Sequence, residues 1–441
     1  MPFDSESRKT INMQREPFEL DATEAAQRIA NGELTSEALV RSCLERISAR
    51  EPEVRAWAFL DAELALAQAR ACDRETPRSF LHGVPVGIKD LLDTADMPSQ
   101  YGSPIYRGHQ PKADASCIAL LRAAGCVILG KTVTTEFANI HPAQTCNPHN
   151  PAHTPGGSSS GSAAAVADYM VPLALGTQTG GSTIRPAAYC GVVGLKPTFN
   201  AINRAGLKFS AETLDTIGLI ARNVDDVTLG LDVLLGRSTL VDKSVTHNTP
   251  RVGVVHTSHW KEADSASREN LMHAAELLTD AGATVTNVSL NQKAESLYEM
   301  HSKIALYEAA RSLAWEYLNY PDLISRTFLP KIEEGWKVPR VVYDNSRKVA
   351  HECRGEFSNQ MLDHDFLLTL SGPDEAPFGF NTNGSSIFNR IWTLLGVPCI
   401  NIPFGHGLNG LPLGVQLVGR LDGDEDLLMW ARWARLYLHW D

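Results

Sequence analysis

Apolar positions along the chain follow two alternating patterns, one typical of helices and one typical of buried strands. Over residues 17–72 apolar side chains recur at helical spacing, and Asp21 and Thr35 precede two of these stretches as expected N-caps. Asp114 is expected to cap a further helix that ends near Ala124. Short, continuous apolar runs that predict buried strands lie at 84–88, 126–129, 252–255, 284–288, 366–370, 399–402 and 413–418.

Helical spacing returns between these runs, near 271–282, through most of 291–360 and from Asp424 onward. Because helices alternate with short apolar strands, we expect a mixed, twisted central sheet that is covered by helices on both faces. No Pro/Ser-rich linker divides the chain. The sequence therefore predicts an N-terminal tail at 1–16, followed by a single large α/β domain at 17–441.

The overall composition is that of a folded globular protein. Hydrophobic residues make up 43% of the 441 positions and charged residues 21%, which excludes disordered, collagen-like and fibrous classes. Lys and Arg number 40 against 51 Asp and Glu, giving a net charge of −11. Such a chain lacks the positive surface that phosphate backbones and anionic membranes attract, so we expect neither nucleic acid nor a membrane as a partner.

Cysteine usage and the N-terminal sequence both bear on the compartment. The eight cysteines form no C-x-x-C pair, and a chain of this size folds without disulfides, which favours a reducing compartment. The first twenty residues contain no continuous apolar core of a secretory signal, and no apolar stretch approaches the ~20 residues of a membrane span. A cytoplasmic protein is expected.

Two glycine–serine loops carry the candidate chemistry. They centre on Ser158 and Ser182, which are 24 positions apart, and the first loop runs directly into the alanine-rich stretch 163–167. Glycines beside a serine let backbone N–H groups converge on an anion and expose the hydroxyl, which suits acyl transfer. A serine hydroxyl is a weak nucleophile by itself, so the hypothesis requires a base.

Lys89 is the candidate base. The sequence has no G-x-S-x-G elbow, and none of the 14 histidines stands out as the partner of a serine. Lys89 directly follows the apolar run 84–88, and burial at the end of such a strand would favour its neutral, proton-accepting form. Taken alone, Lys89 also fits a solvated strand end, because charged side chains are seldom buried.

An ordered set of motifs resembles the amidase signature family over most of residues 80–435. The matching segments are GVPVGIKD at 83–90, GGSSSGSAAAVA at 156–167, PLALGTQTGGS at 172–182, PAA at 186–188, CGVVGLKPT at 190–198, DTIG at 215–218, GVP at 396–398 and PLGVQL at 412–417. The resemblance implies the amidase signature fold. It also implies a Ser–Ser–Lys triad.

Within that resemblance, Ser182 matches the nucleophile, Ser158 the bridging serine that follows a cis peptide bond, and Lys89 the base. The backbone N–H groups expected to form the oxyanion hole belong to Thr179, Gly180, Gly181 and Ser182. The implied reaction is hydrolysis of a C–N bond in a small-molecule amide through an acyl-enzyme, without metal or organic cofactor. Carbamates and esters fit the same chemistry, and a homodimer is compatible with it.

The sequence departs from the family pattern at several positions. Gln178 stands where the family often has aspartate, Arg185 lies one place later than the frequent arginine, and Ser160 and Asn200 replace glycines. None of these changes removes a triad member. They count against the amide-splitting subunit of a tRNA-dependent amidotransferase, which remains the alternative. A binding protein that has lost activity is disfavoured because the triad is intact.

Two further groups of residues have competing interpretations. Four residues could supply zinc ligands: His141, Cys146, His149 and His153. Their spacing matches no common zinc site, so an ordered entry loop is the favoured interpretation. Arg185 is expected to secure the catalytic loop by hydrogen bonds rather than to bind a substrate carboxylate. A substrate wall is expected from Tyr101, Ser103, Phe388 and Trp392, for which an ordinary core position is the competing interpretation.

Overall fold

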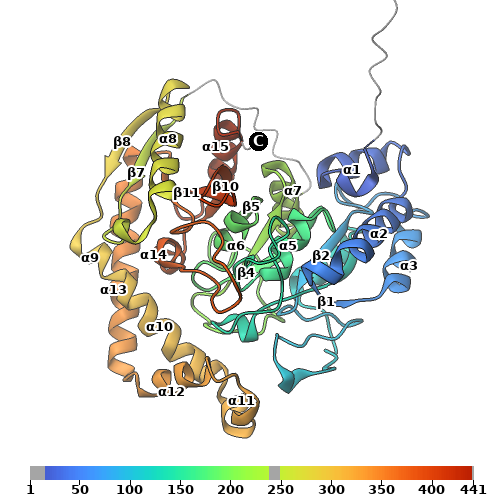
Figure 1. Cartoon of the computed structure of the whole chain (residues 1–441), viewed down its shortest axis with the longest axis horizontal. Helices are drawn as coiled ribbons and strands as arrows, with labels where there is room; N and C mark the ends of the chain where they lie inside the picture. The colour runs from blue at the N-terminus through green and yellow to red at the C-terminus, as the bar shows by residue number, and fades with distance from the viewer. Residues whose placement is uncertain (1–14, 238–248, 440–441) are drawn as a thin grey trace, which may run out of the picture.

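A mixed sheet of eleven strands runs through the described part of this computed structural model, residues 15–237 and 249–439 (Figure 1). The order across the sheet is β1-β3-β2-β4-β6-β5-β10-β11-β9-β7-β8. β2 runs parallel to β3 and β4, and β7 runs parallel to β8 and β9, whereas the other neighbours are antiparallel. The strands are β1 (Trp57–Leu60), β2 (Pro85–Lys89), β3 (Val127–Thr132), β4 (Leu173–Gln178), β5 (Val193–Lys196), β6 (Thr216–Ala221), β7 (Arg251–Val255), β8 (Thr284–Val288), β9 (Phe366–Leu370), β10 (Cys399–His406) and β11 (Pro412–Val418).

Helices connect these strands and complete the single large α/β domain that was predicted. The tail expected at 1–16 lies, as far as residue 14, outside the described residues. The helices are α1 (Ala22–Ala30), α2 (Ser36–Val54), α3 (Ala62–Cys72), α4 (Ser116–Ala123), α5 (Ser160–Ala167), α6 (Ile184–Tyr189), α7 (Val224–Leu234), α8 (Ser265–Asp280), α9 (Gln292–Glu295), α10 (Leu297–Ser312), α11 (Ala314–Asn319), α12 (Leu329–Lys337), α13 (Arg340–Gln360), α14 (Ile387–Leu395) and α15 (Asp424–Arg435).

The sheet is covered on both faces, as the alternation of its side chains demands. In β3, Val127 and Leu129 pack into one hydrophobic cluster with apolar residues of α2, α3 and α5. Ile128, whose side chain points to the opposite face, belongs to the cluster that includes α4 and α7. The N-terminal helices and the group formed by α10, α12 and α13 lie on opposite sides of the molecule (Figure 1).

The expected N-caps of the first two helices are present, but the third is not. The Asp21 side chain accepts a hydrogen bond from Glu24 N at 2.7 Å, and the Thr35 hydroxyl accepts one from Ala38 N at 3.1 Å. Asp114 instead accepts from the backbone N–H of residue 95 and from the Arg122 guanidinium, and Ala115 takes the N-cap position of α4. A tertiary partner has therefore outcompeted local capping at this carboxylate.

Residues 57–60 were expected to be helical and form the edge strand β1 instead. β1 pairs antiparallel with β3, with Trp57 opposite Thr132 and Phe59 opposite Lys131. The preceding helix ends at Arg55, which has the left-handed φ of 55°. Four residues are too few to distinguish a helical from a strand period, so pairing with a neighbouring strand decides their conformation.

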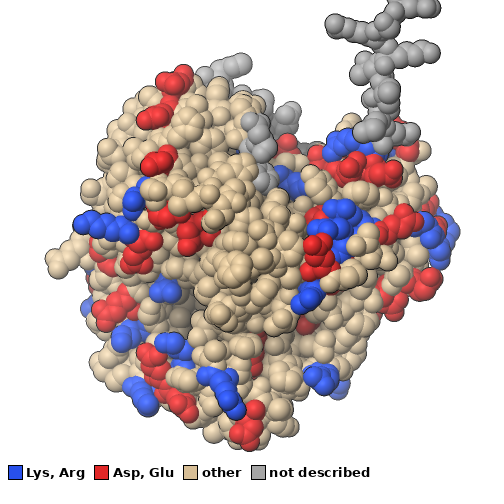
Figure 2. All heavy atoms as spheres, viewed as in Figure 1, with Lys and Arg blue, Asp and Glu red and all other residues tan. Residues whose placement is uncertain are grey.

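Three further properties concern the surface charges, the cysteines and the lengths of the helices. On the face shown in Figure 2, basic and acidic side chains are interspersed rather than gathered into one extended patch. The eight cysteines are free and buried. None of the helices in the described ranges combines the length and apolar character that crossing a bilayer requires.

Two helical glycines provide a matched test of how tightly the central helix α5 is packed. A Cβ added at Gly161 would lie 2.1 Å from Ala56 O and 2.3 Å from Val133 N, whereas one added at Gly355 on α13 meets nothing within 4 Å. Gly161→Ala is expected to lower the free energy of unfolding by about 1–3 kcal/mol or more. Gly355→Ala is expected to raise it by up to ~1 kcal/mol. Urea unfolding measures both, and equal effects would contradict this packing.

Candidate active site

Lys89 ends the fully buried strand β2, between β3 and β4 in the sheet. Its Nζ lies 2.8 Å from Ser158 Oγ and 2.7 Å from Thr177 Oγ1. No carboxylate of the described residues forms an ion pair with this amine. Burial lowers the pKa of Lys89 well below its usual value, and the charge of Asp215 opposes part of the shift. The neutral amine is therefore favoured, and a neutral amine can accept a proton.

The loop that carries Ser158 lies directly against the loop that carries Ser182. Ser158 follows a cis peptide bond with Gly157 and stands just before α5, as the resemblance implied. Ser159 N donates to Ser182 O at 3.3 Å, which joins the two loops. The Arg185 guanidinium donates to Gly157 O at 2.5 Å, so this arginine secures the serine loop by a hydrogen bond, as expected.

The turn at 179–182 has its carbonyl groups engaged and its N–H groups open. His301 Nε2 donates to Thr179 O at 2.8 Å, and the Thr393 hydroxyl donates to Gly180 O at 2.8 Å. Within the described residues, no acceptor is paired with the backbone N–H groups of 179–182. The carbonyl oxygens thus accept hydrogen bonds from side chains outside the turn, whereas the N–H groups have no partner among the described residues. These N–H groups are therefore available to an anion in the cavity.

Gln178, which stands where the family often has aspartate, joins the turn at 179–182 to two helices. Its Oε1 accepts hydrogen bonds from the N–H groups of Thr183 and Ile184 at 3.0 Å each, at the start of α6. Its Nε2 donates to the Thr393 hydroxyl at 3.0 Å. An amide can accept and donate at the same time, so one side chain ties the catalytic turn to both α6 and α14.

Asp215 supports the same turn from the opposite side. The carboxylate accepts from the Thr179 hydroxyl at 2.5 Å and from the N–H groups of Ser210 and Ala211 at 2.7 and 2.9 Å. Burial raises the pKa of Asp215 to about 6, although these hydrogen bonds lower it. The turn is thus fixed by contacts from several distant segments.

Ser158 and Ser182 open into one cavity of about 490 Å³. Both serines are largely buried, with 2% and 7% of their surface exposed. The rest of the cavity is lined by the turn at 179–182, by residues of α10 and α14, and by the segment 381–386. A small molecule that entered this cavity would meet both hydroxyls.

The four side chains expected to form a substrate wall do not line this cavity. The Tyr101 hydroxyl donates to Asp93, and the Ser103 hydroxyl accepts from the N–H of residue 105. Phe388 and Trp392 are 1% and 0% exposed because they form the core-facing side of α14. The structure places Arg390 of the same helix in the lining instead, together with Ser386, which directly precedes the helix.

Sequence reasoning missed several residues that shape the cavity. His301, Thr393 and Arg390 contact or line it, although none belongs to the motifs quoted above. Burial lowers the pKa of His301 to about 4, helped by the charge of Arg390, so its ring is neutral near pH 7. Arg390 had a visible signal, because it is the only charged residue of α14. His301 had none.

The histidines of the entry loop bond to other parts of the chain. The rings of His149 and His153 lie 2.9 and 2.7 Å from the carbonyl oxygens of Cys190 and Ala376, and the ring of His141 contacts Thr327. Across the described ranges, no group of three or more His, Cys, Asp and Glu side chains is arranged to hold a metal ion.

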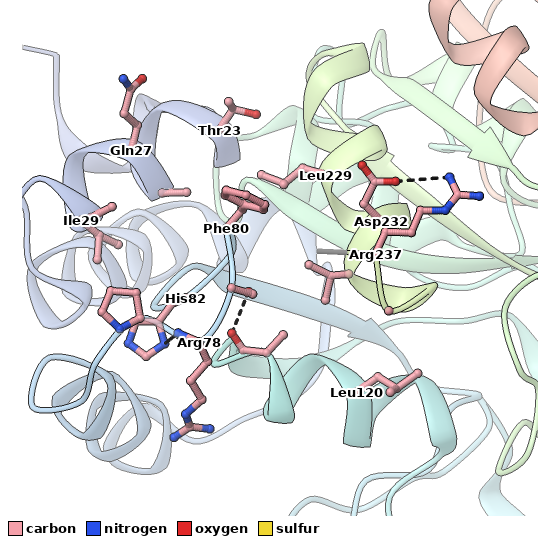
Figure 3. A pocket seen from close by; sticks show the side chains of 17 residues that line it. Thr23, Gln27, Ile29, Arg78, Phe80, His82, Leu120, Leu229, Asp232 and Arg237 are labelled. Carbon is pink, nitrogen blue, oxygen red and sulfur yellow. Dashed lines mark hydrogen bonds and ion pairs between the residues drawn. The ribbon is translucent and has the colours of Figure 1, made fainter. Parts of the chain in front are cut away.

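A larger cavity of about 940 Å³ lies elsewhere, between α1, α4, α7 and the segment 77–82. Figure 3 shows that apolar side chains, such as Phe80 and Leu229, and polar ones, such as Gln27 and Asp232, both line it. Its charged pair, Asp232 and Arg237, is 3.5 Å apart, and His82 Nε2 lies 3.0 Å from Cys72 O. No serine–lysine pair lies there among the described residues, so the smaller cavity is the candidate site.

Comparison with known sequences shows the family of the chain. The Amidase family model matches residues 38–428. The chain is 34% identical to a glutamyl-tRNA(Gln) amidotransferase subunit of Chloroflexus aggregans, over 93% of this chain and 94% of that one. It is 33% identical to the corresponding amidotransferase protein of Lysinibacillus sphaericus, over 91% and 93% of the two chains.

Solved structures of amide hydrolases have the same fold. The 6-aminohexanoate cyclic dimer hydrolase complexed with substrate superposes with a TM-score of 0.87 at 25% identity, over 97% of this chain and 98% of that one. The peptide amidase of Stenotrophomonas maltophilia superposes with a TM-score of 0.80 at 28% identity, over 96% and 99%. By sequence and by fold, this chain belongs to the amidase family.

Proposed function

We propose that this protein is a cofactor-independent amidase that hydrolyses a C–N bond of a small-molecule amide through an acyl-enzyme on Ser182. The observation that carries the proposal is the buried Lys89 amine, 2.8 Å from Ser158 Oγ, beneath a cavity that Ser182 also lines. The family match over 38–428 supports treating residues 17–441 as the amidase domain.

Acylation begins with proton transfer toward the lysine. The neutral Lys89 amine takes the proton of Ser158, Ser158 takes that of Ser182, and Ser182 Oγ attacks the carbonyl carbon of the amide. The N–H groups of the turn at 179–182 stabilise the oxyanion of the tetrahedral intermediate. In such sites the loss of one donor costs about 10²- to 10³-fold in rate.

The intermediate then collapses and the acyl-enzyme is hydrolysed. Ser158 delivers its proton to the leaving nitrogen and recovers one from Lys89, the C–N bond breaks, and the amine departs. Water then attacks the ester carbonyl on Ser182, its proton passes back along the same path, and a carboxylic acid is released. These steps draw on no metal or organic cofactor. Carbamates and esters fit the same sequence.

The second candidate is the amide-splitting subunit of a multi-subunit amidotransferase. Relatives 33–34% identical to this chain are named as subunits of such an enzyme, which favours it. The stand-alone amidase is favoured by the hydrolases among the structural neighbours and by the departures at Gln178 and Arg185. We therefore propose the stand-alone enzyme, with a small-molecule amide as its partner.

A fluorophosphonate reagent tests the nucleophile without knowledge of the substrate. An activated serine oxygen attacks phosphorus and displaces fluoride, so the wild-type protein should gain one phosphonyl group on the peptide that contains Ser182. Ser182→Ala should remain unlabelled and should lose at least ~10⁴-fold in amide turnover. Ser302→Ala is the matched control, because this serine lines the same cavity but its hydroxyl donates to Tyr298 O of its own helix. Labelling of Ser182→Ala at the wild-type rate would exclude Ser182.

The pH dependence of stability tests the protonation state of Lys89. An unfolded lysine binds a proton up to about pH 10.4, whereas the buried amine has a lowered pKa. Between the lowered pKa of the folded state and that pH, the unfolded chain therefore binds one more proton than the folded one, and this contribution makes the free energy of unfolding rise with pH. Lys89→Met should lack this rise and be more stable than wild type at pH 7. Urea unfolding between pH 6 and 10 that gives parallel curves would refute a neutral Lys89.

Copurification separates the two candidate functions. The tagged chain should elute without a second polypeptide and should release ammonia or an amine from a panel of small amides, anilides and carbamates. Size-exclusion chromatography with mass spectrometry of the products measures both. Turnover that appears only after another polypeptide is added would favour the amidotransferase subunit.

A further inference from the structure

The cavity around Ser158 and Ser182 is lined by cationic side chains and, among the described residues, by no acidic one. Its charged lining residues are Arg185, Lys331 and Arg390. The whole chain has the opposite balance, with 51 acidic against 40 basic residues. A positive potential confined to one cavity attracts anions.

Arg390 sits within reach of the acyl-binding turn. Its Nε donates to the Ser386 hydroxyl at 3.1 Å, one helical turn earlier on α14. Ser386 lies against the turn, since a Cβ built on Gly180 would be 3.3 Å from Ser386 Oγ. Thr393, three residues after Arg390, donates to Gly180 O. The turn is therefore close to Ser386, just before the helix, and hydrogen-bonded to Thr393 on the far side of the arginine.

The guanidinium of Arg390 has no anionic partner in the described part of the chain. No carboxylate forms an ion pair with it, and its only hydrogen bond there is the one to Ser386. Burial lowers the pKa of Arg390, and the negative charge of Glu262, which is too far away to form an ion pair, opposes part of this shift. Because a partly buried cation without a partner is unfavourable, a bound anion would compensate for its desolvation.

The other two cations of the cavity are less available to a ligand. Arg185 is only 6% exposed, and its guanidinium donates to the carbonyl of Gly157 and so holds the serine loop, although its Nε has no partner among the described residues. Lys331 is exposed and forms an ion pair with Glu334 at 3.0 Å. Arg390 is therefore the cationic side chain that is both near the turn and open to a ligand.

We propose that the amide substrate carries a carboxylate and that the Nη groups of Arg390 bind it. This inference rests on the proposed amidase function and narrows its substrate to amides that carry a carboxylate, of which half-amides of dicarboxylic acids are the simplest. A planar guanidinium matches a carboxylate in a bidentate pair. The described lining offers no acidic side chain for an α-ammonium group. The site therefore prefers glutaramate, which lacks that ammonium, to glutamine.

Matched substrates test the proposal on the purified full-length chain. Glutaramate and pentanamide have the same length and differ by the carboxylate, and glutamine adds an α-ammonium to glutaramate. Ammonia release should give a kcat/KM for glutaramate that is about tenfold or more above those for the other two. Arg390→Gln should lower kcat/KM for glutaramate by about 10- to 100-fold, as expected for a lost charge-assisted hydrogen bond, and that for pentanamide by less than about threefold.

Two further variants and one measurement on the wild-type protein distinguish lost carboxylate binding from misfolding of Arg390→Gln. Arg390→Lys keeps the charge and should retain part of the preference for glutaramate. Lys331→Gln removes a cation from the rim and should leave the ratio of the two kcat/KM values unchanged. Glutarate should protect wild-type Ser182 from the fluorophosphonate, whereas pentanol should not.

The outcomes separate the two proposals. Equal losses on glutaramate and pentanamide in Arg390→Gln, a preference for pentanamide, or absence of protection by glutarate would each overturn the carboxylate site while leaving the amidase function intact. Absence of both labelling and turnover would overturn the amidase function itself.

Discussion

The site depends on the burial of the Lys89 amine. This burial disfavours the charged form, because hydroxyl groups surround the amine and no carboxylate of the described residues forms an ion pair with it. Lys89 gains hydrogen-bonding partners in Ser158 and Thr177, and neither neutralises an ammonium. A charged lysine there would lose far more solvation than two hydroxyls return, so folding favours the uncharged amine. The position of Lys89 at the end of a central strand makes the burial unavoidable, because both neighbouring strands are buried as well.

Around that amine, the two serine loops are fixed by bonds to the surrounding framework. The carbonyl groups of the turn at 179–182 are occupied by His301 and Thr393, and its threonine hydroxyl by Asp215. The cis-bonded loop is secured by Arg185. Electrostatic stabilisation of an oxyanion requires donors that are oriented before the reaction, and in the proposed mechanism these outer contacts would provide that orientation.

Much of the fold followed from local signals in the sequence. The apolar runs at 84–88 and 366–370 became buried strands, and Asp21 and Thr35 cap the helices they precede. The edge strand β1 escaped prediction because its four residues carry no period, and its conformation comes from pairing with β3. Where the local sequence was ambiguous, the tertiary partner decided.

The site was predictable to the extent that motifs encode it. Lys89, Ser158 and Ser182 were named from sequence and share hydrogen bonds or one cavity. The substrate wall was not predicted correctly. Phe388 and Trp392 were expected to line the cavity, but their side chains face the core. Residues 386, 390 and 393 lie three or four positions apart and therefore share the other side of α14. The spacing of these three residues predicts that they share one face of the helix, whereas the predicted wall consisted of the aromatic residues on the other face.

Helix α14 joins two tasks that many enzymes keep on separate segments. It holds the turn at 179–182 through the hydrogen bond from Thr393 to Gly180 O, and one helical turn earlier it places Arg390 in the cavity lining. A shift or rotation of this helix to admit a bulkier ligand would drag the turn along and impair chemistry. Diversification of this scaffold is therefore expected to proceed by exchanging the side chain at position 390 on a stationary backbone.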